Sequence, residues 1–201
     1  MNAAVPDYYS FVVSKYPYEV TVGDLKLRLG QQGEDAKNYI VDFIYNRLNH
    51  RYVEPLMHIP CEKKSGFLMM ASACLLIETL QSLYEGRNRT ETGDGGPSFE
   101  RFFSREEQYF PDFTDARVNF YSNIRCGILH QAETKGGYRI LRDYSALLNI
   151  ENRTIEANRF LAALKDCLDN YIKKLRASDC DPELWKLAKD KVDFICENCK
   201  S

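Results

Sequence analysis

Apolar residues recur every three or four positions over most of the chain after residue 33, which is the period of a helix with one buried face. The first of these helices is expected to begin at Glu34, and Pro55 limits its end. The residues on its apolar face are Ile40, Phe43, Ile44 and Leu48. The pattern therefore predicts a helical protein whose regular part starts at Glu34.

A second helix is predicted at 62–84, and it carries two adjoining apolar stripes. One stripe consists of Phe67, Met70, Cys74 and Ile77, and the other of Ala73, Leu76, Leu80 and Leu83. Two stripes side by side give a broad apolar face, which indicates a central helix of the fold.

Polar, glycine-rich sequence follows at 86–98, where we expect an exposed and flexible loop. Ser98 is then expected to cap a short helix that contains three phenylalanines, Phe99, Phe102 and Phe103. The next helix is predicted at 112–131, and Gly136-Gly137 ends the segment after it. Its apolar stripe consists of Phe113, Ala116, Phe120, Ile124 and Ile128.

The rest of the chain predicts a small β element and two further helices. Segments 138–140 and 148–155 are expected to form a β-hairpin, with its turn at 151–152. A helix is predicted at 158–178, and its apolar face consists of Leu161, Leu164, Leu168, Tyr171, Ile172 and Leu175. The last helix is expected to have Asp181 as N-cap and Pro182 at its first position. Its apolar face consists of Trp185, Ala188, Val192 and Ile195.

These elements together predict an all-α fold, a bundle of about five helices with a small β-hairpin. The helical domain is expected to span 34–201. Residues 1–33 mix aromatic residues with prolines and glycines, so we expect an irregular N-terminal extension packed on the core, with a short strand at 18–22.

Composition favours an ordinary globular chain, with 44% hydrophobic and 28% charged residues among 201. The net charge of −2 excludes general electrostatic binding of nucleic acid, so any RNA site must be local. The seven cysteines are scattered and no secretion signal is visible at the start, which predicts reduced thiols and a cytoplasmic location. The longest apolar run, 67–77, is shorter than the roughly 20 residues that span a bilayer, so no membrane partner is expected.

Arg125 and His130 lie five residues apart near the end of a predicted helix. In a regular helix they would differ by about 140° around the axis and about 7.5 Å along it. The long arginine side chain can still lean toward the histidine, and the two could converge better across a symmetric dimer interface.

Arginine and histidine suit the cleavage of a phosphodiester bond without a metal. Histidine can accept the proton of an RNA 2′-hydroxyl or protonate the leaving oxygen. The planar guanidinium of arginine stabilises the added negative charge of the transition state. The alternative interpretation is a surface arginine and a histidine that favours the negative end of the helix dipole. Arg51 and His58 have a similar spacing, but Pro55 separates them, and we assign them no role.

The stretch RCGILHQAETKGG at 125–137, which follows a long apolar helix and a loop, resembles a bacterial and plasmid-borne family of the HEPN superfamily (higher eukaryotes and prokaryotes nucleotide-binding). The resemblance covers roughly 34–178, and its specific part is about a dozen residues. It implies a dimeric helical bundle, and many such proteins are metal-independent ribonucleases of toxin–antitoxin, anti-phage or CRISPR-linked systems. The family's arginine and histidine fall on Arg125 and His130, which line one cleft in the dimer.

The resemblance also suggests supporting residues. Glu78 is the candidate for an acidic residue that faces the site from the preceding long helix, and Glu85 is a weaker one. The residue after the motif arginine is commonly polar, often asparagine, but here it is Cys126, which lacks the hydrogen bonds of an amide. Asn123 is a candidate to replace that amide. Gln131 and Lys135, which both follow the histidine, are candidates for contacts with phosphate. For Gln131 and Lys135, an ordinary exposed polar residue is the alternative. For Glu78, the alternative is a residue on the solvent edge of its helix or one paired to a nearby basic residue.

No cofactor or metal is expected. Cys196 and Cys199 form a single CxxC without a second pair at zinc spacing, and no phosphate-binding loop of the Walker or Rossmann kind is present. The phenylalanines at 99–113 could stack on bases, but their helical spacing favours the core or a dimer interface.

The sequence therefore predicts an endoribonuclease that binds RNA as a homodimer, with an antitoxin or a defence-system protein as a further partner. The alternative is a non-catalytic HEPN-like module that binds RNA, a nucleotide or a protein.

Overall fold

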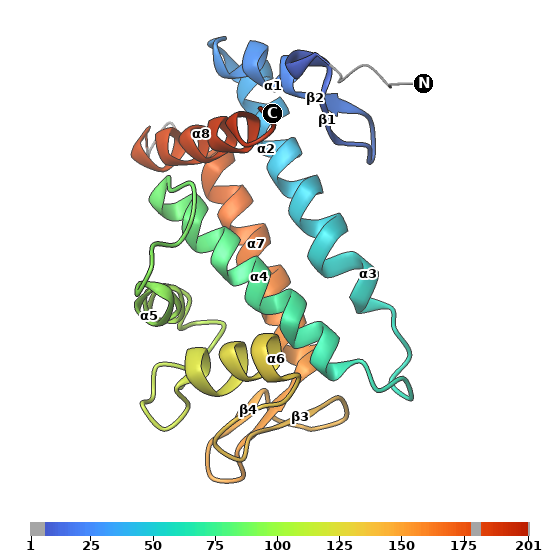
Figure 1. Ribbon diagram of the computed structural model, residues 1–201, viewed down its shortest axis with the longest axis vertical. Coiled ribbons are helices and arrows are strands. Elements are labelled where there is room, and N and C mark those ends of the chain that lie inside the picture. Colours follow the sequence, from blue (N-terminus) through green and yellow to red (C-terminus); the bar gives the residue numbers. More distant parts are fainter. Residues whose placement is uncertain (1–6, 178–181, 201) are drawn as a thin grey trace. The chain divides into compact units, whose positions relative to one another are not determined.

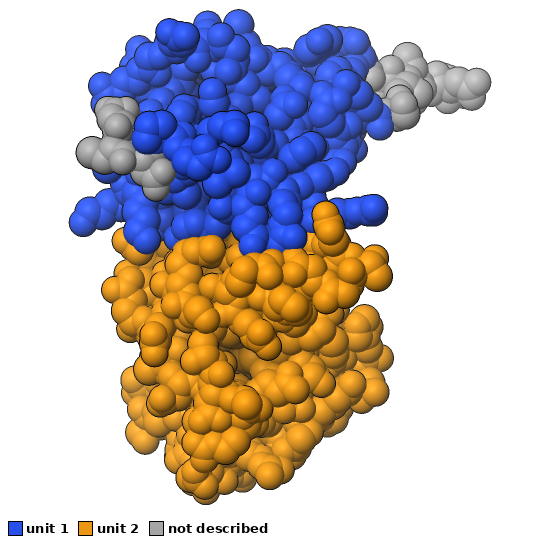
Figure 2. Space-filling model, turned by 90° about the vertical axis from the view of Figure 1, so that its left-hand side faces the viewer, with its two compact units in different colours: residues 1–50, 82–89, 171–201 blue, residues 51–81, 90–170 orange. Residues whose placement is uncertain are grey.

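The computed structural model describes residues 7–177 and 182–200, and it is mostly helical with a few short strands (Figure 1). The chain divides into two compact units (Figure 2). Unit 1 comprises 1–50, 82–89 and 171–201, and unit 2 comprises 51–81 and 90–170. Two long helices contribute residues to both units, α4 (Gly66–Glu85) and α7 (Ala157–Arg176).

The described part of the N-terminal segment is more regular than expected. It contains the 3-10 turn η1 (Tyr8–Ser10), the antiparallel strands β1 (Val12–Ser14) and β2 (Val20–Thr21), and α1 (Val22–Leu29). The strand within 18–22 is confirmed, but the irregular structure predicted after it is wrong. Thr21 starts α1 because its side chain accepts a hydrogen bond from the Asp24 amide while the Asp24 carboxylate accepts one from the Thr21 amide. The helix contacts α2 and α8 within unit 1.

Helix α2 (Glu34–Leu48) begins at the predicted residue. All four residues of its predicted apolar face are buried. Pro55 does not mark the end of helical structure, because the π-helical η2 (Asn49–Val53) leads into α3 (Glu54–Met57). Proline is tolerated there because the first turn of a helix needs no donor from its backbone nitrogen.

Helix α4 confirms the broad apolar helix, although it starts at Gly66 rather than Glu62. Both of its stripes are buried except for Phe67, which is partly exposed. Among the described residues it is the helix long and apolar enough to cross a membrane, and 61% of its most apolar window is buried within the protein. That burial is what a core helix shows.

Helix α5 (Gly95–Arg105) begins inside the segment expected to be a loop. Ser98 is buried within the helix, so its predicted role as a cap is wrong. The phenylalanines nearby form an aromatic core in unit 2, which confirms that they are packing residues. Its members are Phe99, Phe102, Phe103, Phe110, Phe113, Phe120 and Phe160, all at most 3% exposed.

The helix predicted at 112–131 is much shorter. Turns occupy 112–118, the π-helical η3 spans Tyr121–Arg125, and α6 spans Cys126–Gln131. Asp112 (φ 67°) and Asn119 (φ 38°) are left-handed, which a right-handed helix cannot accommodate. Ala116, expected on the apolar stripe, is therefore exposed in a turn.

The β element of unit 2 is a three-stranded sheet in the order β3-β5-β4 rather than a lone hairpin. Its strands are β3 (Arg139–Leu141), β4 (Leu148–Asn149) and β5 (Thr154–Glu156). Strands β4 and β5 form the expected antiparallel hairpin around 151–152, whereas β3 pairs parallel to β5. Gly136 and Gly137 have positive φ and form the turn before β3.

Helix α7 confirms the helix predicted at 158–178, with its whole apolar face buried. Helix α8 (Pro182–Glu197) starts with proline as expected. Asp181, the predicted N-cap, lies outside the described residues. The buried face of α8 is turned slightly from the prediction, because Trp185 and Ile195 are partly exposed. The buried positions are Leu184, Ala188, Val192 and Cys196.

Candidate functional site

A π-helical turn carries the motif arginine. In η3 the Cys126 amide donates to the Tyr121 carbonyl, five residues earlier, and the regular helix α6 then carries His130 in its last turn. Such π turns occur often at functional sites because they redirect side chains that a regular helix would hold apart.

Arg125 contacts both other candidate residues of the site. Its Nε donates to Oε1 of Glu78 at 2.8 Å, and its Nη1 lies 3.3 Å from Nε2 of His130. A guanidinium can only donate, so this contact requires a neutral imidazole that carries its hydrogen on Nδ1. Arg125 and His130 therefore meet within one chain, without a partner subunit.

Burial within the site is graded. The side chains of Arg125 and Glu78 are 19% and 25% exposed, whereas His130 is exposed. Burial disfavours the charge on Arg125, but the Glu78 carboxylate more than offsets this effect and raises the pKa of the guanidinium. Glu78 thus holds the positive charge of Arg125 in place beside an exposed histidine.

Tyr121 belongs to the site, although we did not predict it. The Arg125 guanidinium carbon lies 5.5 Å from the centre of the Tyr121 ring, a cation–π distance. Burial, followed by a hydrogen bond with Cys126, raises the pKa of Tyr121, so its hydroxyl stays protonated. The available signal was the spacing, since an aromatic residue four positions before an arginine shares its side of a helix.

The two thiols near the site are Cys126 and Cys74. Cys126 is partly exposed, and its thiol is hydrogen-bonded to the Tyr121 hydroxyl. Cys74 is buried, and burial followed by the Glu78 charge raises the pKa of its thiol. A protonated, buried thiol is a poor nucleophile, so Cys74 is a packing residue.

Asn123 serves the backbone rather than the reacting groups. Its side-chain amide donates to the Val118 carbonyl at 2.9 Å, and its own carbonyl accepts the Lys135 amide at 2.7 Å. The loop after α6 is thereby fixed against η3. Gly127 permits this approach, because a Cβ there would lie 2.4 Å from the Glu133 carbonyl oxygen.

The structure brings the remaining candidates less close to the reacting groups. Gln131 is exposed at the end of α6, and Lys135 is partly exposed in the loop. Neither has a recorded side-chain contact with Arg125 or His130 among the described residues. Glu85 pairs instead with Arg87 in unit 1.

Among residues 7–177 and 182–200, no group of three or more His, Cys, Asp or Glu is placed to hold a metal ion. In the CxxC, Cys196 is buried and burial raises its pKa to about 11, while the Cys199 thiol donates to the Ile195 carbonyl. Cys180 lies outside the described residues.

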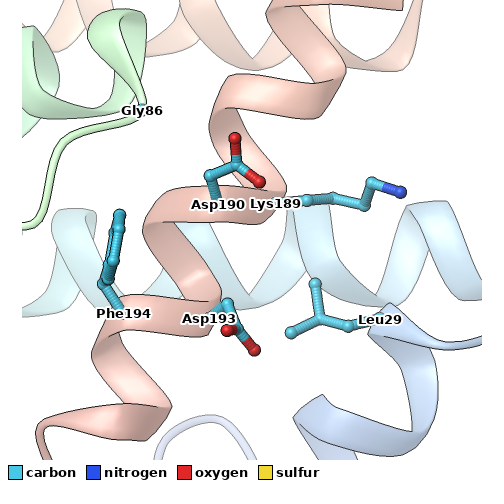
Figure 3. A pocket seen from close by; sticks show the side chains of 6 residues that line it. All are labelled: Leu29, Gly86, Lys189, Asp190, Asp193 and Phe194. Atoms are coloured by element: carbon cyan, nitrogen blue, oxygen red, sulfur yellow. The ribbon is translucent and has the colours of Figure 1, made fainter.

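Two pockets differ in their relation to these residues. A pocket of about 180 Å³ in unit 2 includes Tyr121 in its wall, beside Arg125. A pocket of about 340 Å³ in unit 1 lies along α8, where Asp190, Asp193 and Lys189 line it (Figure 3). None of the candidate residues lines the pocket of unit 1, and Asp193 there is paired with Lys26.

No family model, curated protein or solved structure matches the chain.

Proposed function

We propose that the protein is a metal-independent endoribonuclease of the HEPN type. This proposal rests on the contact of 3.3 Å between Arg125 Nη1 and His130 Nε2, together with the hydrogen bond that Arg125 Nε donates to Glu78. The contact joins a permanent positive charge to an exposed proton acceptor, which are the two groups that transesterification of RNA needs.

The reaction begins when a phosphate of the RNA takes over the hydrogen bond of Arg125 and releases His130 Nε2. His130 then accepts the proton of the 2′-hydroxyl, and the 2′-oxygen forms a bond to phosphorus. The bond from phosphorus to the 5′-oxygen breaks, and that oxygen takes a proton from a second, protonated histidine that a dimer would supply. The products are a 2′,3′-cyclic phosphate and a 5′-hydroxyl. Arg125 stabilises the charge that develops on the phosphoryl oxygens.

A homodimer fits this reaction because each chain has one histidine in the site, whereas the reaction needs a base and an acid. The helices that carry the site also expose apolar side chains, with Leu68 58%, Leu75 43% and Leu129 36% accessible. Three exposed leucines on α4 and α6 favour an interface there. A second copy would bring a second His130 to the cleft.

The setting that we propose is the bacterial cytoplasm, in defence or as a toxin with a cognate partner protein. The resemblance at 125–137 supports this setting.

A second function is a non-catalytic HEPN-like module that binds RNA, a nucleotide or a protein. The thiol of Cys126, in place of an amide, and the net charge of −2 favour it. Retention of the Arg125–His130 contact favours the enzyme.

Cleavage of a mixed RNA pool in EDTA tests the enzyme, with Arg125→Ala and His130→Ala as variants. Arg51→Ala and His58→Ala are matched controls, because both residues are exposed and have a similar spacing in the sequence. We expect cleavage by the wild type and by both controls, and its loss in both site variants. Equal cleavage by all five proteins would refute the assignment, and the absence of cleavage by a folded wild type would favour the binding module.

A further inference from the structure

The pocket of about 180 Å³ in unit 2 is distinct from the catalytic residues but shares a wall with them. Helix α5 and the turns at 113–121 enclose it. The lining residues used below are Gly96, Glu100, Thr114, Asn119 and Tyr121.

The floor of this pocket is aromatic. Phe99, Phe103, Phe113 and Phe120 line it, and each is at most 3% exposed. An apolar cavity of roughly 150 Å³ binds benzene. A space of about 180 Å³ therefore suits one planar ring system and excludes an attached sugar and phosphate.

The rim is polar and acidic. Glu100 and Thr114 are exposed and offer acceptors, and Asp115 is already bonded through both oxygens to Arg117. Asn119 accepts the Ser122 amide through Oδ1. Carboxylates repel a phosphate but accept hydrogen bonds from an exocyclic amino group. The rim thus selects a neutral ring that carries N–H donors.

Tyr121 connects this pocket to the catalytic residues. It lines the pocket, packs 5.6 Å from Phe99 between ring centres, and lies 5.5 Å from the Arg125 guanidinium carbon. A group in the pocket and a phosphate on Arg125 would be separated by the width of one aromatic ring. Single-stranded RNA is commonly bound in this way, with a base splayed into an aromatic pocket beside its backbone.

We propose that this pocket binds one base of the RNA beside the cleaved bond and selects bases with an exocyclic amino group. Guanine fits best, because its adjacent N1–H and N2–H donors match the two oxygens of Glu100. Uracil, which has no amino group, fits worst. This inference rests on the proposed RNA substrate, and it assigns a specificity that the Arg125–His130 contact does not itself provide.

Two substitutions probe the pocket without touching the catalytic residues. Gly96→Leu fills it, whereas Gly96→Ala is a matched control because the added Cβ lies at an ordinary 3.6 Å from Tyr121. Glu100→Gln replaces one acceptor with a donor. Glu107→Gln is its control, since Glu107 is exposed just beyond the same helix and does not line the pocket.

Binding is measured in the His130→Ala background, with four labelled RNA oligonucleotides that differ in one central base and otherwise contain only uridine, the nucleoside expected to fit the pocket worst. We expect guanine to bind tightest and uracil weakest. Gly96→Leu and Glu100→Gln should each weaken binding of the guanine oligonucleotide about tenfold or more. Gly96→Leu does so by filling the pocket, and Glu100→Gln by removing a hydrogen bond to a charged group. The two control variants should bind as the background does.

Equal affinity for all four oligonucleotides, or an unchanged affinity in Gly96→Leu, would overturn the pocket. Cleavage mapped with wild-type His130 separates this failure from that of the proposed function. Cleavage without base preference would refute the pocket and leave the ribonuclease intact. Selective binding without cleavage would support the pocket and refute the ribonuclease.

Discussion

Two arginines of unit 2, Arg125 and Arg142, have sharply different surroundings. Arg142 donates to the carbonyls of Ile59, Pro60 and Lys63 at 2.7–2.8 Å, and it also bonds to the side chains of Ser65 and Asn158. Each of its three nitrogens is engaged by the protein. The recorded bonds of Arg125 use Nε and Nη1, and the second ends on an exposed histidine.

This difference separates a structural arginine from the one that we propose to be reactive. The bonds of Arg142 tie the 59–65 loop to the start of α7, and a ligand could not take them over without unfolding that junction. In the proposed reaction, the bond from Arg125 to His130 is exchanged for a phosphate of the RNA, while Glu78 keeps the guanidinium in place. A charge that is anchored on one edge and accessible on the other is preorganised for catalysis.

The largest expected effect is on cleavage by Arg125→Ala and by His130→Ala. Each should lower the single-turnover rate by roughly 10²–10³-fold, the typical result of removing one stabilising donor at a transition state. The melting temperature of His130→Ala should change little, because His130 is exposed. A large loss of stability with a normal rate per folded molecule would reverse the roles of the two arginines.

Arg142→Ala should act on stability instead. It leaves several loop carbonyls without a donor, so we expect a loss of about 2–4 kcal/mol in unfolding free energy, measured by urea titration. Arg142→Lys should restore only part, because an ammonium cannot reproduce the planar fork. The cleavage rate of the folded fraction should remain normal, and a specific loss of rate would contradict a purely structural role.

Gly95→Ala tests whether Tyr121 helps to position Arg125. A Cβ at this position would lie 2.2 Å from the Tyr121 hydroxyl oxygen, so the ring must move away from α5. Because Tyr121 packs under Arg125, we expect the cleavage rate to fall by roughly tenfold, equivalent to about 1.4 kcal/mol. Gly96→Ala is the control, and equal rates for the two variants would show that Tyr121 does not position Arg125.

The smallest expected effect concerns the ion pairs that Lys26 and Glu197 form in unit 1. Lys26 contacts Asp193 and Glu197 at 2.6 Å each. Hydrogen bonds from Lys200 and Lys26 lower the pKa of Glu197 to about 2. A lowered folded-state pKa contributes stability above the ordinary value near 4.5, and this contribution is lost as the pH falls toward about 2.

The melting temperature of Glu197→Gln relative to the wild type, followed between pH 7 and pH 2, measures this contribution. We expect a small deficit at neutral pH, since exposed ion pairs contribute little, and a deficit that shrinks as the pH falls toward 2. A deficit that is the same at pH 2 as at pH 7 would mean that Glu197 acts through packing rather than charge.

The long helices could be predicted because their apolar stripes are regular. Helix α2 starts at Glu34, and the stripes of α4 and α7 are buried as expected. The region before Arg125 could not be predicted in the same way. Its apolar residues have helical spacing, but left-handed Asp112 and Asn119 turn the chain into an aromatic core instead of a helix.

The candidate site shows the same division between local and distant information. The proximity of Arg125 and His130 follows from a short stretch of sequence, and a π turn replaces the angle of a regular helix. The contact from Glu78 crosses 47 residues, and the resemblance rather than any periodicity suggested it. The support from Tyr121 is local and the bonds of Arg142 come from distant segments, but neither was predicted.

The most direct test of the account is cleavage in EDTA of one RNA and of its counterpart with a single 2′-deoxynucleotide at the cleaved position. The account predicts that the RNA yields a 2′,3′-cyclic phosphate and a 5′-hydroxyl, and that the deoxy-substituted strand stays intact at that position. Cleavage of the substituted strand, or products with a 5′-phosphate, would contradict attack by the 2′-hydroxyl and with it the roles of Arg125 and His130.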